Sequence, residues 1–514
     1  MLRPFLLLVS FLALLSSAVS HPPLRATLID CGATSPTPSP QGEWLPDADF
    51  VSSGTPLTLP INYADPTLNT LRTFPLHDGR KFCYEVPVFR GARYMVRTTY
   101  FYGGIGGDGS TPPVFKQIVD GTVWSLVNTT ADYARNMATY YEGYFLATGK
   151  TMSVCLGVDE FTDSDPFISA LELVVLGDSV YNTTDFEQYG LSLVERSSFG
   201  YTGPTIRYPD DPYDRFWEPY ARSGVPQTSM KNVTVSGFWN LPPLKVFEQE
   251  LIVPVLEQMD LQWPTGILDG QSQDYYIALY FADDQDSIAT PRILNITVNS
   301  VPYYSNLTIS SAGVTVFASE WPLTGQTKLK LAPAPGSQLG PLLNAGEVLE
   351  RLQIKRKTHT RDVIALEKIK SSLRSYPSDW SGDPCMPDNY PWTGVSCSYG
   401  RRYRVTALNL TNMGISGSLS PNFANLTALT SIVLDGNKLS GYIPDLSSLR
   451  NLELLHLNDN QLSGPIPSSL GSINSLRELY LQNNDFTGEV PKSLERPGLD
   501  LKTYGNKLSS TPSS

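Results

Sequence analysis

The spacing of apolar residues divides this 514-residue chain into a long β-like part and a shorter repetitive part. Before about residue 353, short runs of aromatic and β-branched residues, such as residues 94–102, alternate with clusters of proline and glycine. The segment Lys328–Leu331 alternates charged and apolar side chains, as a half-buried strand does. Because turns rather than long helical patterns separate these runs, the pattern predicts antiparallel β-sandwiches instead of an α/β fold.

The β-like part shows signs of an internal duplication. Pro166–Glu172 and Pro341–Glu347 share a pattern of proline, two apolar residues, a small polar residue, alanine, any residue and glutamate, at an offset of 175 residues. Tyr100-Phe101 and Tyr280-Phe281 end two similar aromatic strands at an offset of 180 residues. Two matches at nearly the same offset predict two tandem lobes, at residues 21–190 and 191–357, with chance similarity as the alternative.

Residues 358–378 predict a helical connector after the second lobe. The apolar positions that recur at helical spacing are Val363, Leu366, Ile369 and Leu373. Asp362 is expected to cap this helix or to lie in its first turn. We interpret the helix as one that packs between domains rather than one that binds a partner.

Apolar residues then recur every 23 to 24 positions from residue 404 to residue 508. The expected strands are Leu408–Leu410, Ile432–Leu434, Leu455–Leu457 and Leu479–Leu481, and the asparagines that follow them are Asn437, Asn460 and Asn484. This period predicts a solenoid whose leucines share one core and whose asparagines bond to backbone groups at the turns. Met413 replaces the asparagine of the first unit, and residues 499–508 form a truncated last unit before a polar tail, residues 509–514.

Residues 379–403 form the junction between the helix and the repeats. Cys385 and Cys397 bracket a loop that contains Pro384, Pro387 and Pro391. The prolines exclude a helix, and a loop this small buries no core of its own. A disulfide between the two cysteines is therefore the expected staple, and the segment is interpreted as a cap on the first rung of the solenoid.

The three other cysteines are Cys31, Cys83 and Cys155, which allow three pairings with one thiol left over. A Cys83–Cys155 bond is the preferred pairing. No zinc site is expected, because no two cysteines are two to four residues apart and the chain has only four histidines. No other metal and no cofactor are expected.

Residues 1–20 predict a secretory signal, in which Arg3 precedes an apolar run and Ala18-Val-Ser20 offers a cleavage site. No later stretch stays apolar for about 18 residues, so no transmembrane segment is expected. The net charge of -12 argues against nucleic acid or an anionic membrane as a partner. Seven sequons predict N-glycosylation, at Asn128, Asn182, Asn232, Asn295, Asn306, Asn409 and Asn425.

Several motifs of the chain point to one family. Those of the β-like part are Ile29–Gly32, Leu71–Pro75, Phe82–Tyr84, Val154–Leu156, Pro166–Leu173 and Arg207–Trp217. Over residues 25–355 they resemble the plant malectin-like domain, a tandem pair of malectin-type β-sandwiches in receptor-kinase ectodomains. Gly382-Asp-Pro-Cys385 is similar to the element that precedes the repeats in those receptors, and the repeats resemble the plant-type leucine-rich repeat. The resemblance implies a mainly β fold, with tandem malectin-like sandwiches followed by a short leucine-rich-repeat solenoid.

No pattern in the chain predicts catalysis. Gly104–Gly109 matches the dinucleotide fingerprint, but Ser110–Pro113 forbids the helix that has to follow it. The histidines lie far apart in sequence, so no nucleophile has an evident base beside it. The acidic pairs Asp210-Asp211 and Asp283-Asp284 could supply the two carboxylates of a glycosidase, although adjacent acids in turns are more often solvated. The chain is therefore expected not to be an enzyme.

Sugar binding is implied by the resemblance to malectin, which binds a glucose disaccharide through aromatic and acidic residues on loops. Ring faces can stack on sugars while carboxylates accept hydrogen bonds from hydroxyls. The expected residues are Tyr100, Phe101, Tyr102 and Asp108 in the first lobe and Tyr280, Phe281, Asp283 and Asp284 in the second. The chain departs from the animal lectin at Ile105-Gly106, where that protein has a Tyr-Phe pair. A role of these aromatic residues in the strand core is the alternative.

The repeats offer a second surface, because residues that flank the strand leucines face the concave side of a solenoid. These residues are Asn409, Thr411, Val433, Asp435, His456, Asn458, Tyr480 and Gln482. The mixed polar set with one tyrosine suits a peptide or the edge of another protein.

Together these features predict a secreted, glycosylated recognition protein of the plant cell surface, cell wall or apoplast. It is expected to bind a carbohydrate, a peptide or a receptor-kinase ectodomain, as a receptor-like, co-receptor or decoy module without a membrane span or kinase. The alternatives are a lectin for wall polysaccharide, with the repeats as a scaffold, and a glycosidase.

Overall fold

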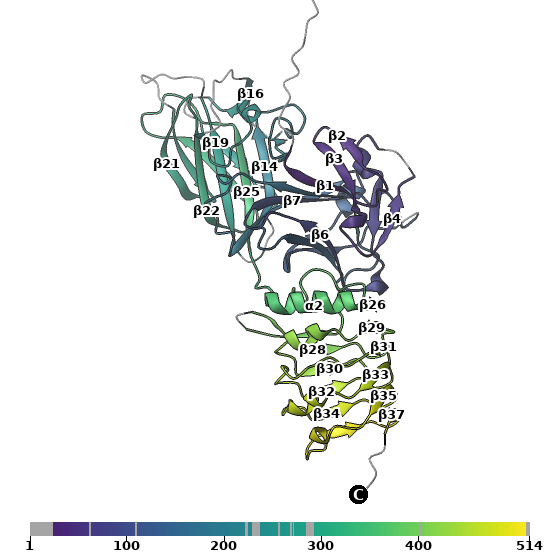
Figure 1. Ribbon diagram of the computed structural model, residues 1–514. Coiled ribbons are helices and arrows are strands. Elements are labelled where there is room, and N and C mark those ends of the chain that lie inside the picture. The colour runs from purple at the N-terminus through teal and green to yellow at the C-terminus, as the bar shows by residue number, and fades with distance from the viewer. Residues whose placement is uncertain are drawn as a thin grey trace, which may run out of the picture.

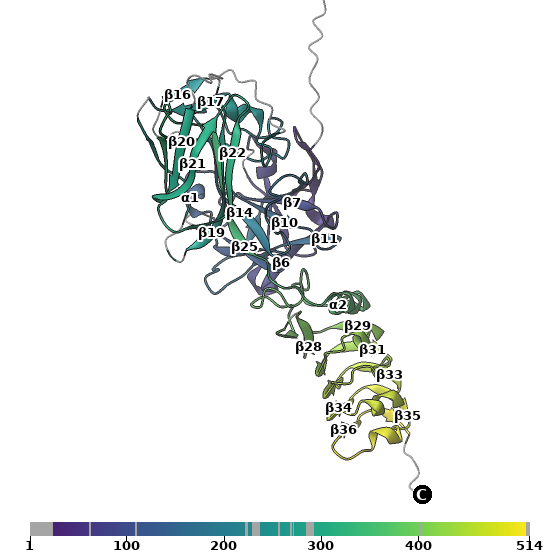
Figure 2. The same ribbon diagram turned by 90° about the vertical axis from the view of Figure 1, so that its left-hand side faces the viewer.

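Two β-sandwiches form the head of the molecule, and a stack of leucine-rich repeats forms its stem (Figure 1). Helix α2 (Thr360–Ser372) lies across the end of the stem, between the head and the first repeat strands (Figures 1 and 2). The computed structural model describes residues 24–60, 63–107, 110–220, 225–228, 237–254, 257–267, 270, 272–283, 292–400 and 402–509. The predicted fold class is confirmed: the protein is mainly β, with tandem sandwiches before a solenoid.

One sheet of 11 strands runs through both sandwiches. Its order is β2 (Thr37–Ser39), β3 (Gly42–Pro46), β1 (Ala26–Asp30), β13 (Ala170–Val175), β7 (Arg93–Tyr100), β10 (Thr139–Leu146), β14 (Tyr189–Phe199), β25 (Ala345–Gln353), β19 (Gln273–Phe281) and β22 (Val314–Leu323), with β15 (Glu218–Tyr220) beside β14. Strand β14 pairs with β10 of the first lobe on one side and with β25 of the second lobe on the other. The lobe boundary expected at residues 190 and 191 lies inside this shared strand.

Each lobe completes its sandwich with a four-stranded sheet. The first lobe uses β6 (Lys81–Pro87), β11 (Thr151–Gly157), β8 (Phe115–Val119) and β9 (Thr122–Val127), and the second uses β18 (Met259–Gln262), β23 (Lys328–Pro333), β20 (Arg292–Val298) and β21 (Val301–Ile309). Smaller sheets are β12 (Phe167–Ile168), β5 (Thr70–Thr73) and β4 (Thr55–Thr58), and β16 (Val225–Thr228), β17 (Gln249–Ile252) and β24 (Leu342–Leu343). The short helix α1 (Thr130–Tyr133) follows β9. Each sandwich therefore buries a core of its own.

Hydrogen bonds at the duplicated motif show how the two lobes correspond. Ser169 breaks the strand between β12 and β13, and its Oγ accepts from the backbone N–H of Phe101 at 3.0 Å. Asn344 breaks the strand between β24 and β25, and its Oδ1 accepts from the N–H of Ala282 at 2.8 Å. The small polar residue of the sequence pattern therefore has the same role in both lobes. By this register Tyr100 corresponds to Phe281, one residue away from the match suggested by the Tyr-Phe pairs.

A row of buried charges crosses the shared sheet where the two lobes meet. Arg97 contacts Glu142 at 2.8 Å, and Arg196 contacts Glu142 at 2.8 Å and Glu347 at 3.0 Å; all four side chains are 0% exposed. Burial alone would raise the pKa of Glu142, but Arg196 and Arg97 lower it to about 2. The ion pairs of Glu142 with Arg196 and Arg97 therefore stabilise the fold above pH 4.5, the ordinary pKa of a glutamate. This contribution is lost as the pH falls towards 2.

The motif Arg207–Trp217 covers this row of charges. Asp214 accepts from Arg97 at 3.3 Å and from Arg207 at 2.7 Å. Asp211 accepts from Arg215 at 2.9 Å and from the indole N–H of Trp217 at 2.8 Å. The motif thus adds a further carboxylate beside Arg97 and pairs its own buried charges, Asp211 and Arg215, with each other.

Loss of Arg196 should destabilise both lobes together, because Glu142 and Glu347 would then be buried without the cation that they share. We expect Arg196→Met to lower the free energy of unfolding of the head by about 3 to 5 kcal/mol. The matched variant Arg477→Met removes an exposed arginine that lies 4.0 Å from Glu453 and should cost less than about 1 kcal/mol. Urea unfolding followed by tryptophan fluorescence measures both changes, and equal midpoints for the two variants would contradict the assignment.

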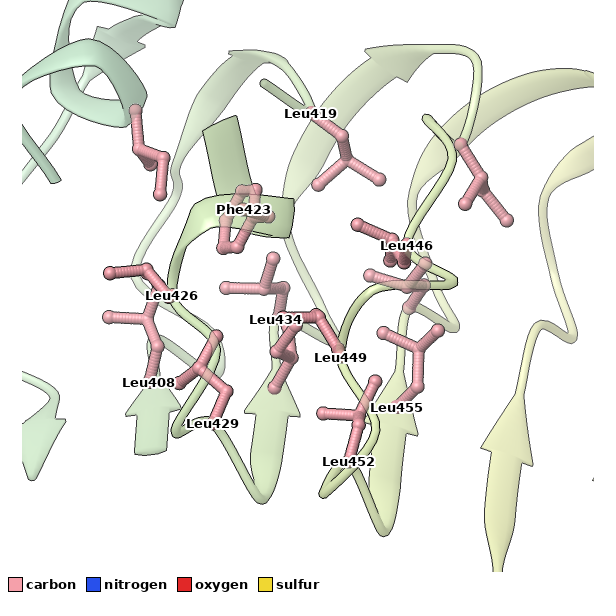
Figure 3. Packing of buried hydrophobic residues seen from close by; sticks show 14 of the residues in the cluster. Leu408, Leu419, Phe423, Leu426, Leu429, Leu434, Leu446, Leu449, Leu452 and Leu455 are labelled. Atoms are coloured by element: carbon pink, nitrogen blue, oxygen red, sulfur yellow. The ribbon is translucent and has the colours of Figure 1, made fainter. Parts of the chain in front are cut away.

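The stem stacks its repeats as two ladders of strands. One ladder contains β27 (Val395–Ser398), β28 (Arg404–Asn409), β30 (Ser431–Val433), β32 (Leu454–His456), β34 (Glu478–Tyr480) and β36 (Asp500–Lys502). The other contains β26 (Leu373–Ser375), β29 (Ser416–Ser418), β31 (Lys438–Gly441), β33 (Gln461–Pro465), β35 (Asp485–Gly488) and β37 (Lys507–Leu508). Leucines from successive rungs pack against one another between them (Figure 3). The buried face of α2, with Leu366 and Ile369, closes the first rung of this core.

The predicted asparagine ladder is confirmed. Asn437 donates to the carbonyls of Leu410 at 2.8 Å and Leu434 at 3.0 Å, and it accepts from the N–H of Ile415 at 2.8 Å. Asn460 and Asn484 repeat this pattern one rung further on each time. Each asparagine therefore fastens its own turn to the rung before it.

The N-terminal end of α2 agrees with one of the two roles expected for Asp362. His359 is the N-cap, and Asp362 lies buried in the first turn. Its carboxylate accepts from Arg404 at 2.7 Å and from the N–H of Val405 at 3.1 Å. Asp362 thus joins the helix to the first repeat strand.

The junction segment lies directly against the first lobe. The ammonium of Lys81, whose side chain is buried, donates to the carbonyls of Asp383 at 2.7 Å and Met386 at 2.9 Å. The N–H of Gly382 donates to Glu85 at 2.6 Å. Gly382 has φ +65°, and a Cβ there would lie 2.8 Å from the sulfur of Cys83, so only glycine fits. These hydrogen bonds and the close contact at Gly382 therefore hold the junction in one position against the underside of the first lobe, the surface that faces the stem.

Both preferred disulfides are present in the structure. Cys83 and Cys155 lie opposite each other on β6 and β11, and Cys385 bonds to Cys397 in the junction. Cys31 is the thiol left over and is buried in the first lobe.

Removal of the junction disulfide should loosen the stem but leave the head folded, since each sandwich has its own core. The bond closes a short loop, and a disulfide of this kind contributes about 3 kcal/mol to the free energy of unfolding. We expect Cys385→Ser/Cys397→Ser to expose the first repeats to limited proteolysis, while Ser396→Ala in the same segment changes nothing. Mass spectrometry of the fragments locates the cuts, and equal cleavage of the head would show that the disulfide does not act as a cap.

Candidate ligand-binding surfaces

Most residues of the predicted sugar set belong to the core of the lobes. Tyr100, Tyr280 and Phe281 are 0% exposed, and the hydroxyl of Tyr280 donates to Glu347 at 2.6 Å in the row of charges between the lobes. Phe101 is 2% exposed. Tyr100, Tyr280 and Phe281 lie on strands and Phe101 directly follows one, and all four rings are buried, so the structure does not support them as stacking platforms for a sugar.

The acidic residues of the predicted sugar set differ in what the structure shows of them. Asp283 is buried and pairs with Arg292 at 2.6 Å. Asp108 and Asp284 lie outside the described residues. The other acidic pair is also divided: Asp211 is buried in the Arg207–Trp217 motif, and Asp210 pairs with Lys245 at 2.8 Å. The described members of these pairs are engaged with cations, which argues against their use as a pair of catalytic carboxylates.

A cavity of about 410 Å³ does open at the loop end of the first lobe. Tyr102 borders it, and Ile105-Gly106 from the glycine-rich segment forms part of its wall. Asp163, Ser164 and Asp165 line the opposite wall, and both aspartates are exposed. Of the predicted sugar residues that the structure describes, only Tyr102 reaches this cavity. The sequence signal for the other wall was the polar run immediately before Pro166.

The predicted concave residues lie in two files on the ladder that contains β28 to β36. Asn409, Val433, His456 and Tyr480 occupy equivalent positions on neighbouring strands, and Lys502 extends this file. Thr411, Asp435, Asn458 and Gln482 follow two residues later on each rung. Gln482 is 8% exposed and belongs to the interior more than to the surface. The others remain at least partly accessible.

Rings and charges form a continuous stack at the C-terminal end of the first file. The rings of His456 and Tyr480 are stacked with centroids 4.2 Å apart, and Lys502 Nζ lies 3.6 Å from the centroid of Tyr480. Glu478 contacts His456 at 2.9 Å, and Asp500 accepts from the Tyr480 hydroxyl at 2.7 Å. The hydrogen bond to Asp500 raises the pKa of Tyr480 and lowers that of Asp500. Glu478, Asp500 and Lys502 were not predicted from the sequence, although strand periodicity places them on the same face.

The sequons have different positions relative to these surfaces. Asn128, Asn182, Asn306 and Asn425 are exposed, and Asn295 is half-buried. Asn409 is exposed on the first rung of the repeat face, so a glycan there would cover the N-terminal end of the first file. Asn232 lies outside the described residues. Glycosylation of these asparagines remains a prediction.

None of the helices in the described ranges is both long and apolar enough to cross a bilayer. Within the same ranges, no cluster of three or more His, Cys, Asp or Glu side chains is arranged to hold a metal ion.

Fused sandwiches followed by a disulfide-capped repeat array define the architecture of the chain. The family model of the malectin-like domain matches residues 29–350, that of the leucine-rich repeat N-terminal domain matches residues 359–398, and that of the leucine-rich repeat matches residues 451–473 and 475–496. Because the first match covers more than half of the chain, the chain belongs to the malectin-like domain family.

The curated relatives are plant receptor-like kinases. A probable leucine-rich-repeat receptor-like serine/threonine-protein kinase of Arabidopsis thaliana is 33% identical over 472 residues, which is 87% of this chain and 49% of the relative. A second such kinase of the same plant is 30% identical over 423 residues, 78% of this chain and 47% of the relative. The chain thus spans about half the length of the curated relatives it matches.

Solved structures share the fold of the head. The ANX2 ectodomain of Arabidopsis thaliana matches with a TM-score of 0.52 and 16% identity, over 64% of this chain and 97% of that chain. A chain in the complex of the plant peptide RALF23 with FER and LLG2 matches with a TM-score of 0.51 and 18% identity, over 65% of this chain and 96% of that chain. At these identities the likeness concerns the fold alone.

Proposed function

We propose that this chain is an extracellular recognition module of the plant cell surface or apoplast, whose repeat face binds a peptide or the ectodomain of another protein. The observation that carries the proposal is the stack of His456, Tyr480 and Lys502 on the ladder from β28 to β36. Its support from the comparisons is indirect: the curated relatives are receptor-like kinases, and one structural neighbour was solved with a peptide.

The stack has the properties of a pre-organised binding surface. The stack offers the edges of two aromatic rings and the positive charge of Lys502 within three neighbouring rungs. Glu478 and Asp500 hold the stacked side chains in place, so little side-chain entropy is lost when a partner binds. The strands beneath are fixed by the shared leucine core, which makes the surface rigid. A glycan on Asn409 would confine a partner to this C-terminal end.

Truncation of the stacked side chains should strongly weaken the binding of a partner. Purified receptor ectodomains and synthetic cell-wall peptides are screened against the full chain, and each binder is measured again with Tyr480→Ala and His456→Ala. Removal of a central aromatic typically costs about 2 kcal/mol or more, so we expect Kd to rise by roughly thirtyfold. Tyr442→Ala removes a tyrosine that is 69% exposed beside β31, on the other ladder, and should leave Kd unchanged. Binders that ignore all three substitutions would refute the proposed surface.

Carbohydrate binding by the head is the second candidate, and the cavity beside Tyr102 favours it. The cavity combines the edge of an aromatic ring with two exposed carboxylates, as sugar sites do. Lectin activity of this kind would leave the repeats as a scaffold.

A glycan array probed with the full chain and with Asp163→Ala tests the carbohydrate site. If a wall oligosaccharide binds beside Tyr102, its signal should fall at least tenfold in Asp163→Ala, since a charged hydrogen bond contributes about 1.5 to 3 kcal/mol. Asp178→Ala changes an exposed aspartate outside the cavity and serves as the control. A signal that survives Asp163→Ala, or an array without any signal, would count against the lectin reading.

A further inference from the structure

A cavity of about 500 Å³ lies between the underside of the first lobe and the end of the stem. One wall comes from β6, β11 and the turns beside them, and includes Glu85, Asp120 and Ser153. The other comes from the linker before α2, from α2 itself and from the junction segment. Figures 1 and 2 show α2 below the first lobe in both views, which places the cavity where the two parts of the molecule meet.

Helix α2 lines this cavity with the face that it does not use for packing. Leu366 and Ile369 point into the core of the stem. The cavity is lined instead by residues on another face of the helix, namely Thr360, Val363, Glu367 and Lys370. This face holds one apolar and three polar residues, so it provides both a surface for an aliphatic stem and acceptors for a polar group.

The basic groups of the cavity are already engaged within the protein. Lys357 donates to Asp120 at 2.6 Å and to Thr148 at 2.7 Å. Lys370 donates to the carbonyl of Trp380 at 2.5 Å and lies above the rings of Tyr376 and Trp392. Lys357 is therefore paired with a carboxylate, and in the cavity lining the two lysines are outnumbered by four carboxylates, which disfavours an anion.

Two of the acidic groups are engaged as well. Asp120 accepts from Lys357 and from the N–H of Ser153 at 2.8 Å. Asp383 accepts from the N–H groups of Thr358, Cys385 and Met386 at 2.9 to 3.0 Å. These carboxylates hold the linker and the junction in place.

Glu85 and Glu367 have acceptor capacity to spare. Among the hydrogen bonds of the described residues, Glu85 accepts one, from the N–H of Gly382 to its Oε1, and the residue lines the cavity. Glu367 stands on the accessible rim of the cavity, on α2. Burial raises the pKa of Glu85 to about 7, and repulsion from Asp120 and Glu367 adds to this despite the hydrogen bond from Gly382 and the charge of Lys370. Burial also raises the pKa of Glu367, against the opposing effect of Lys370.

We propose that this junction cavity binds a positively charged side chain, an arginine of an extracellular peptide or of a partner protein's loop. Glu85 and Glu367 stand on opposite walls, so one guanidinium, with its five donors, would satisfy carboxylates of both. Its aliphatic stem would pack on Val363. The proposal concerns a site separate from the repeat face and does not depend on that face binding anything.

An occupant of the cavity would contact the head and the stem at once. A ligand that binds the folded junction stabilises it in proportion to the logarithm of its concentration. The bound arginine should therefore raise the midpoint of thermal unfolding of the stem. It should also bind more tightly as the pH rises through 7, because Glu85, which shares the cavity lining with Asp120, Lys357, Glu367, Lys370 and Asp383, then loses its proton.

The probe is the capped tripeptide acetyl-Gly-Arg-Gly-amide, titrated calorimetrically into the full chain at millimolar concentration. Its counterpart carries citrulline, which has the same shape without the charge. We expect saturable binding of the arginine peptide at pH 8, at least fivefold weaker binding at pH 5.5, and none of the citrulline peptide. Glu85→Gln/Glu367→Gln should abolish binding, while Glu43→Gln/Glu489→Gln, which removes two exposed carboxylates elsewhere, should leave Kd unchanged.

A second variant separates binding from damage to the fold. Val363→Arg supplies a guanidinium from α2 itself, so it should raise the thermal midpoint of the stem and exclude the probe. Absence of saturable binding by the arginine peptide would overturn the proposal, as would equal binding of the citrulline peptide or retention of binding in Glu85→Gln/Glu367→Gln. None of these outcomes bears on Tyr480, so failure here is distinct from failure of the repeat face.

Discussion

The row of charges that runs from Glu172 through Arg97, Glu142 and Arg196 to Glu347 constrains the whole head. Glu172, Arg97 and Glu142 lie opposite one another on neighbouring strands, and so do Arg196 and Glu347, all in a single sheet. Each buried carboxylate needs an arginine from an adjacent strand, and part of the row comes from each lobe. A lobe folded alone would bury unpaired charge or leave it in water. The two sandwiches are therefore one unit of structure, even though each has its own apolar core.

The same constraint explains the role of the long connection after β14. The face of the shared sheet that carries the charges would be exposed if the lobes were joined simply end to end. Instead Arg207–Trp217 covers it: Asp214 accepts from Arg97 of the row, and Asp211 pairs with Arg215 inside the motif. A stretch rich in aspartate and arginine, which suggests a solvated loop by composition, is thus an internal layer. The buried Asp211 and Asp214 stabilise the fold there through their hydrogen bonds.

Periodic features of the sequence predicted the architecture well. The 23- to 24-residue spacing located the repeats, helical spacing located α2, and paired motifs indicated two lobes. These signals are visible in the sequence because each depends on residues a few positions away or one repeat unit away. The observed helix, Thr360–Ser372, lies within the expected connector, and the asparagines bond as expected.

The candidate site was harder to predict, because it depends on contacts between distant segments. Aromatic runs such as Tyr100-Phe101 read equally well as sugar platforms or as strand core, and only the position of the opposing sheet decides between them. The one-residue difference between the Tyr-Phe match and the hydrogen-bond register arose because Ser169 and Asn344, not the aromatic residues, mark the equivalent points. The cavity between Glu85 and Glu367 joins positions 282 residues apart, so no local pattern could announce it.

Gly382 has a consequence for how such proteins can evolve. Its missing side chain leaves room for the Cys83–Cys155 disulfide of another domain, so the two positions restrict each other. A repeat array whose junction carries any other residue there would not seat on this head. Recombination between related genes could therefore not exchange stems freely, and heads and stems should be inherited as matched sets.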